Sequence, residues 1–276
     1  MKGADLIKFC LSLVVVWIHT GTNDLFGLAT LAVPAFFILS GFFLWNKLFA
    51  TEDSGERRRI LSRWLKRILR LYLIWTLIYL PFAVIGIVQD GLPFYKGILV
   101  WLRNVVLVGE NYLSWPLWYL LGLLWAGLIL YLSNKLSLPF WGVCVLGIVM
   151  ASLPFLLKLE SRPLYLSLFK TTRNGLFVGF PLMMLGGLLR ALFPSLKGWN
   201  AGTWQQRTGL ALRFQSIHIY LTHMLWAGGL ILFFHSSKGL FLWGAAVFLS
   251  LLTGLIIAYL PAVQRGLYGR VYVGEK

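Results

Sequence analysis

The residue pair with the clearest chemical potential is Lys8 and His19, eleven positions apart in an apolar stretch. Eleven residues turn a helix through about 1100°, so both side chains leave one helix face, about 16 Å apart along the axis. Asp5 and Ser12 fall near this face. An imidazole can act as a base near neutral pH, and ionisable groups within a membrane span usually face a cavity or a partner. The spacing therefore indicates a functional helix face.

The elements that position this face are membrane helices, as the composition indicates. Of 276 residues, 59% are hydrophobic and 12% are charged, and the mean hydropathy is +0.78. An ordinary water-soluble globule could not bury that much apolar surface. The apolar runs are continuous rather than alternating, which favours helices over a barrel. We therefore expect an all-α, polytopic transmembrane bundle.

One crossing needs about 20 apolar residues. Eight stretches meet this need: residues 6–24, 29–48, 67–88, 115–133, 139–157, 174–193, 209–232 and 239–262. The stretch 95–109 is short and carries Arg103 and Asn104 in its middle, which suits a re-entrant or interfacial helix better. The sequence thus predicts eight spans, and up to about ten. We expect one transmembrane domain, residues 1–262, and a short basic cytoplasmic tail, residues 263–276.

The net charge of +16 is better explained by topology than by nucleic-acid binding, because the basic residues flank the spans. With both termini in the cytoplasm, most of the 25 Lys and Arg residues fall on the cytoplasmic side, as the positive-inside rule requires. No Cys–His cluster has metal-ligand spacing, and no glycine-rich phosphate loop follows a strand pattern. We therefore predict a multi-pass membrane protein with cytoplasmic termini, no metal and no nucleic-acid partner.

Several segments follow the first span in an ordered pattern. These are Ser40-Gly41 in the second span, Arg67 and Arg70 in a basic segment, Trp115-Pro-Leu-Trp118-Tyr-Leu, and Ser216-Ile-His-Ile-Tyr220-Leu-Thr-His223. Together with Lys8 and His19, this order resembles the membrane-bound acyltransferase 3 family over nearly the whole chain. Members often carry arginine where this chain has Lys8. Lysine keeps the positive charge but lacks the planar guanidinium group, which can donate two parallel hydrogen bonds.

The resemblance implies a function at the cell envelope, because members of the family O-acylate sugars of envelope glycans and some antibiotics. We expect an inner-membrane O-acyltransferase that moves an acetyl or similar group from cytosolic acyl-CoA to a hydroxyl of an envelope polysaccharide or lipid-linked sugar. Acetyl-CoA is then a co-substrate, and no bound cofactor is required. His19 is the expected general base, with Lys8 on the donor side and with Ser40 and Trp118 at the substrate.

A second functional face is predicted in the span 209–232. Ser216, Tyr220 and His223 are separated by steps of four and three, which keep their side chains on one side of a helix. If this helix and the first both run outward from the cytoplasm, His19 and His223 reach similar depths, about 21–27 Å along their helices. Tyr220 and His223 are expected to line the substrate site or, alternatively, to join helices by hydrogen bonds. His218 lies off this face and is expected to be structural.

Arg63, Lys66, Arg67 and Arg70 are spaced by three and four residues and predict one cationic stripe on a helix. Coenzyme A carries phosphates, which arginine pairs bind well. Arg67 and Arg70 match the basic motif of the family and are the expected donor-binding pair. The alternative is contact with anionic membrane lipid.

Two polar pairs, Glu110-Asn111 and Arg173-Asn174, lie on the predicted outer side. They either bind acceptor hydroxyls or belong to solvated loops.

Two other classes of function stay open. A transporter or flippase for a small polar or amphipathic solute would use the buried ionisable residues as a relay. A silent membrane anchor for a glycan-assembly complex explains the spans but not the alignment of Lys8 with His19.

Overall fold

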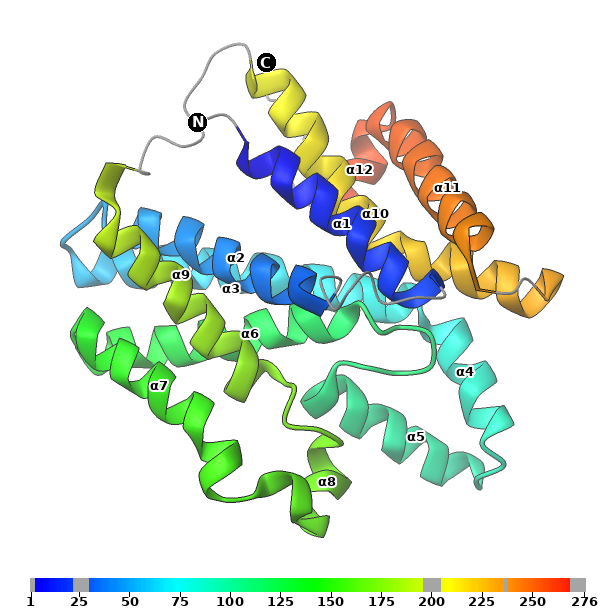
Figure 1. Ribbon diagram of the computed structural model, residues 1–276, viewed down its shortest axis with the longest axis horizontal. Helices are drawn as coiled ribbons and strands as arrows, with labels where there is room; N and C mark the ends of the chain where they lie inside the picture. The colour runs from blue at the N-terminus through cyan, green and yellow to red at the C-terminus, as the bar shows by residue number, and fades with distance from the viewer. Residues whose placement is uncertain (1–2, 22–29, 196–204, 236–237, 269–276) are drawn as a thin grey trace. The chain divides into compact units, whose positions relative to one another are not determined.

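The computed structural model describes residues 3–21, 30–195, 205–235 and 238–268, which form helices and turns without a strand (Figure 1). The α-helices are α1 (Ala4–Thr20), α2 (Ala32–Leu48), α3 (Ser54–Ile78), α4 (Leu80–Gln89), α5 (Phe94–Arg103), α6 (Leu117–Lys135), α7 (Phe140–Leu156), α8 (Pro163–Phe169), α9 (Phe180–Leu192), α10 (Gln205–Phe234), α11 (Leu240–Ala258) and α12 (Pro261–Tyr268). Two wider helical turns, η2 (Asn104–Val108) and η4 (Gly175–Gly179), lie after α5 and before α9. The all-α prediction is confirmed.

The structure supports part of the predicted span count. Among the described residues, four helical segments are long and apolar enough to cross a membrane: Leu117–Lys135, Phe140–Ser161, Gly175–Leu192 and Leu240–Ala258. The bent pair α3–α4 makes a fifth candidate. α1 and α2 have 17 residues each, which gives about 26 Å of helix against a hydrocarbon core of about 30 Å. Helices thus occur in all eight predicted stretches, but eight full crossings are not established.

The predicted span 67–88 is not one straight helix. α3 and α4 meet at Tyr79 with a bend of 52°. Pro81 lies in the first turn of α4, and because proline has no N–H and crowds the preceding turn, it interrupts the helical hydrogen bonds. α5, within the stretch 95–109, has only 10 residues and continues into η2, so it is too short for a full crossing by itself.

The chain divides into two compact units, Met1–Phe36 with Gly198–Lys276 (unit 1) and Phe37–Lys197 (unit 2). In unit 1, α1 lies along α10, and α11 packs against both (Figure 1). The Trp243 indole N–H donates to the Leu13 carbonyl at 3.1 Å, and the Gly239 N–H donates to the Thr20 carbonyl at 2.8 Å. These bonds join the first turn of α11 to the C-terminal half of α1.

In unit 2, two glycines allow α2 and α9 to approach closely. A Cβ placed on Gly41 would lie 2.0 Å from the Met183 carbonyl oxygen, and one on Gly186 would lie 2.0 Å from the Ile38 carbonyl oxygen. Small residues at such crossings are typical of membrane helix pairs. The Ser40-Gly41 motif therefore has a packing function as well as any chemical one.

The expected tail begins as a helix. α12 covers Pro261–Tyr268, and Tyr268 is buried, with 1% of its surface exposed. Its hydroxyl is hydrogen-bonded to His218 Nδ1 on α10. The remainder of the predicted tail, residues 269–276, lies outside the described residues.

Candidate functional site

The two histidines of the sequence prediction meet in unit 1. His19 on α1 and His223 on α10 stack with ring centroids 5.4 Å apart and an interplanar angle of 19°. His19 is half-buried, and His223 is fully buried. They meet because α1 lies along α10 and each helix turns its polar face toward the other.

The two ring nitrogens of His223 have different surroundings. Its Nδ1 lies 3.1 Å from the Ile219 carbonyl oxygen. A carbonyl can only accept, so Nδ1 carries the hydrogen and Nε2 presents a lone pair. Nε2 is buried and has no hydrogen-bond partner in the described part of the chain. Leaving a buried polar atom unsatisfied costs about 1–3 kcal/mol, so a ligand group that donates a hydrogen bond to Nε2 would be favoured here.

The predicted face of α10 continues from His223 towards the N-terminus of the helix. The buried Tyr220 ring forms T-shaped contacts with two other rings. Its centroid lies 6.4 Å from that of His223 and 5.5 Å from that of Phe36. The Ser216 hydroxyl donates to the Lys8 carbonyl at 3.0 Å. One face of α10 therefore meets α1 from Lys8 to His19.

Lys8 lies beside a carboxylate that a second cation already binds. Its Nζ is 4.0 Å from Asp5 Oδ1, while Arg213 donates from Nε and Nη2 to the two Asp5 oxygens at 3.1 and 3.0 Å. Sequence reasoning missed Arg213. The signal was present, because Arg213 lies three residues before Ser216 and extends the same helix face.

His218 points away from the histidine pair. It is buried and makes hydrogen bonds through both nitrogens, Nδ1 with the Tyr268 hydroxyl and Nε2 with the Thr253 hydroxyl at 3.0 Å. These bonds join α10 to α11 and α12. This agrees with the structural function expected of His218.

In unit 2, Ser40 forms a hydrogen bond across helices. Its hydroxyl lies 2.8 Å from the Tyr119 hydroxyl on α6. Trp118 is half-buried, and its ring lies 5.6 Å from that of Phe37. Tyr119 lies in the Trp115–Leu120 segment, but the sequence did not predict a function for it. A contact between two helices leaves no pattern in the sequence of either helix.

The basic stripe lies on α3, as predicted. Arg63 of the stripe forms an ion pair within the same helix, with its Nη2 2.9 Å from a Glu56 carboxylate oxygen. Arg59, one turn before Arg63, also pairs with Glu56, at 3.6 Å from its Nη1. A depression of about 590 Å³ is lined by Glu56, Arg58, Arg59, Ser62, Arg63 and Tyr131. Arg67 is half-buried and Arg70 exposed, and neither lines this depression.

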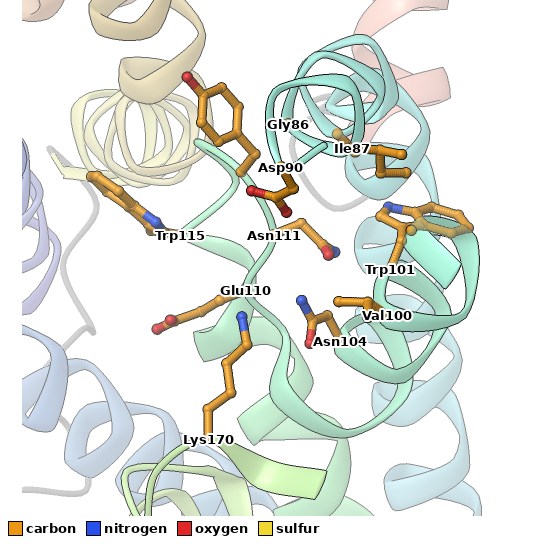
Figure 2. A pocket seen from close by; sticks show the side chains of 13 residues that line it. Gly86, Ile87, Asp90, Val100, Trp101, Asn104, Glu110, Asn111, Trp115 and Lys170 are labelled. Atoms are coloured by element: carbon orange, nitrogen blue, oxygen red, sulfur yellow. The ribbon is translucent and has the colours of Figure 1, made fainter. Parts of the chain in front are cut away.

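A second pocket lies beside α4, α5 and the loop that precedes α6 (Figure 2). Its lining includes Asp90, Asn104, Glu110, Asn111 and Lys170. Burial raises the pKa of the Glu110 carboxyl, against the lowering influence of Arg173 and Lys170.

Asn174 lies outside this pocket lining. Its carboxamide oxygen accepts from the Leu176 and Phe177 N–H groups and caps η4, and its nitrogen donates to the Tyr165 hydroxyl at 2.8 Å. Asn174 thus has a structural function here.

Comparison with known proteins places the chain in a family. A family model described as an acyltransferase domain, acyltransferase 3, matches residues 1–262. One similar protein is the serine/alanine racemase of Enterococcus gallinarum, 28% identical over 209 residues, which make up 68% of this chain and 29% of the racemase. The chain therefore matches less than a third of that relative's length. No solved structure shows significant similarity. Because the family model covers almost the whole chain, the protein belongs to the membrane acyltransferase 3 family.

Proposed function

We propose that this acyltransferase is an inner-membrane O-acyltransferase with cytoplasmic termini, which moves an acetyl or similar group from cytosolic acyl-CoA to a hydroxyl of an envelope saccharide or lipid-linked sugar. Family membership supports the acyl-transfer chemistry. The observation that carries the assignment of the site is the stacked His19–His223 pair with the unpartnered, buried Nε2 of His223.

His19 acts as the general base in this proposal. It removes the proton of the acceptor hydroxyl while the hydroxyl oxygen attacks the thioester carbonyl carbon. The carbon–sulfur bond then breaks, and the coenzyme A thiolate leaves and receives the proton from His19. His223 Nε2 accepts a hydrogen bond from the acceptor and orients it.

The donor is held through its charged groups. We assign Arg67 and Arg70 to the phosphates of coenzyme A, since guanidinium groups bind phosphate with paired hydrogen bonds. Lys8 contributes charge on the donor side, next to the Asp5–Arg213 pair. Ser40, Tyr220 and Trp118 are assigned to substrate contact.

The racemase relative is named for serine and alanine, and its name describes a different reaction. Because the match covers 29% of that protein, we do not propose racemisation for this chain.

The test compares envelope glycans from cells that lack the gene and are complemented with the wild type, His19→Ala or His235→Ala. His235 is an exposed histidine outside the stacked pair, and its substitution is the matched control. We expect O-acyl groups, measured by mass spectrometry, with the wild type and His235→Ala but not with His19→Ala at equal membrane abundance. O-acylation that is unchanged by loss of the gene would refute the proposed function.

A further inference from the structure

The second pocket of unit 2 has the size of a small-ligand site. Its volume is about 260 Å³, slightly below the roughly 300–1,000 Å³ of drug-sized sites. α4, α5, η2 and the loop after η2 surround it, and Lys170 reaches in from the end of α8 (Figure 2). The pocket therefore has space for a metabolite rather than an oligomer.

Opposite charges face this space without pairing with each other. In Figure 2, Asp90 and Lys170 point into the pocket from opposite sides, with the carboxamides of Asn104 and Asn111 beside the space between them. Within the described ranges, neither the Asp90 carboxylate nor the Lys170 ammonium forms an ion pair or a side-chain hydrogen bond. The pocket thus has an acidic end and a basic end.

Asn104 supplies a fixed donor between these ends. It is 5% exposed, and its Oδ1 accepts from Arg103 Nε at 3.1 Å and Nη2 at 2.7 Å. Because the oxygen is held by Arg103, the amide nitrogen must point the other way, into the pocket (Figure 2). No partner for this nitrogen occurs in the part of the chain that the structure describes. This nitrogen is not one of the buried, unpartnered side-chain atoms of the described residues, so it is an accessible donor that a ligand in the pocket can use.

Two further charged groups, Arg103 and Glu110, lie near the acidic and basic ends of this pocket. Arg103 is occupied by Asn104 and by the Ser167 carbonyl, to which its Nη1 donates at 2.7 Å. Glu110 also lines the pocket; burial raises the pKa of its carboxyl, and Arg173 and Lys170 act against this by lowering it. Lys170 has a positive φ of 61°, a backbone conformation that residues with a side chain seldom adopt.

We propose that this pocket binds a small zwitterion of the amino-acid type, with its ammonium group towards Asp90 and its carboxylate towards Lys170 and the Asn104 amide. Each charge of such a ligand meets an opposite charge, so both poles are satisfied together. A neutral sugar would leave the two poles without counter-charges, and an anion would face the Asp90 carboxylate. We infer this binding site without any of the residues that are assigned to acyl transfer.

The test measures binding of three matched ligands to the full-length protein in detergent by ligand-observed NMR titration. L-serine carries both charges, ethanolamine lacks the carboxylate, and glycerate has a hydroxyl in place of the ammonium group. We expect serine to bind at least about tenfold more tightly than either analogue, which corresponds to about one charged contact.

Two charge-neutralising variants locate the poles. Asp90→Asn should abolish the preference for serine over glycerate, and Lys170→Gln should abolish the preference for serine over ethanolamine. Both residues are exposed, so the variants should fold. Lys96→Gln, which removes an exposed lysine of α5 outside the pocket lining, is the control and should bind like the wild type.

Equal binding of the three ligands, or no binding of serine at millimolar concentration, would overturn the proposal. Because binding is measured without turnover, these results do not depend on whether acyl transfer occurs. Loss of acyl transfer in His19→Ala with serine binding unchanged would separate the two sites.

Discussion

The crossing of α2 and α9 gives the sharpest structural prediction. Gly41→Ala places a Cβ 2.0 Å from the Met183 carbonyl oxygen, whereas ordinary contacts begin at 3.4 Å. The obstacle is backbone, which cannot move aside as a flexible side chain can, so the two helices must separate by about 1.4 Å. Overpacking of this kind costs about 1–3 kcal/mol. A clash with backbone belongs at the upper end of this range, and the better helix propensity of alanine offsets about 1 kcal/mol, so we expect a net loss of about 1–2 kcal/mol.

Gly186→Ala disturbs the same crossing from α9, because its Cβ would lie 2.0 Å from the carbonyl oxygen of Ile38 on α2. Once one substitution has separated the helices, the second finds more space. The double variant should therefore lose clearly less stability than the sum of the single losses. Gly142→Ala is the matched control, since its nearest atoms are those of Pro139 at 3.5 Å, and it should be neutral or slightly stabilising.

The assay is unfolding of the purified variants in detergent, with the free energy of unfolding taken from denaturant titrations. Wild-type stability in Gly41→Ala would refute the close approach of α2 to α9. Strict additivity of the two substitutions would show that the glycines do not share one interface.

Three further predictions concern other contacts. Tyr119→Phe and Ser40→Ala should each lose about 0.5–1.5 kcal/mol of unfolding free energy. Because both substitutions remove the same hydrogen bond, the double variant should lose no more than either single variant, and additive losses would contradict this. Asp5→Asn should lose about 1 kcal/mol of unfolding free energy, a modest value because 38% of the Arg213 side chain is exposed. A double-mutant cycle with Arg213→Gln should show that the two losses are not additive. Burial raises the pKa of Glu110 above its ordinary 4.5, so the folded state favours the protonated carboxyl and loses stability as pH rises through the raised pKa. Glu110→Gln should therefore be more stable than the wild type at neutral pH and equally stable below about pH 4.5; a stability difference that does not change with pH would argue against this.

The sequence predicted the features that depend on periodicity. The spacing of Lys8 and His19 and the shared face of Ser216, Tyr220 and His223 follow from helix geometry, and the structure brings these two faces together. Arg213 follows from the same rule applied one step further along α10. The all-α class follows from the continuous apolar runs.

Other features depend on contacts between distant residues. The pairing of Ser40 with Tyr119 joins residues from different helices, and neither residue type indicates its partner. α12 forms where a tail was expected because Tyr268 finds a buried partner in His218, fifty residues earlier. Pro81 was visible in the sequence, but its bend was overlooked because the apolar run continues through it.

The most direct test of the central claim is transfer of radiolabelled acetyl from acetyl-CoA to an extracted envelope fraction by the purified protein. The account predicts transfer by the wild type and by His235→Ala, and a loss of about 10²–10⁴-fold in His19→Ala with acetyl-CoA binding retained. His223→Ala should also lose transfer, because the Nε2 lone pair is removed. Transfer at the wild-type rate by folded His19→Ala protein would contradict the account.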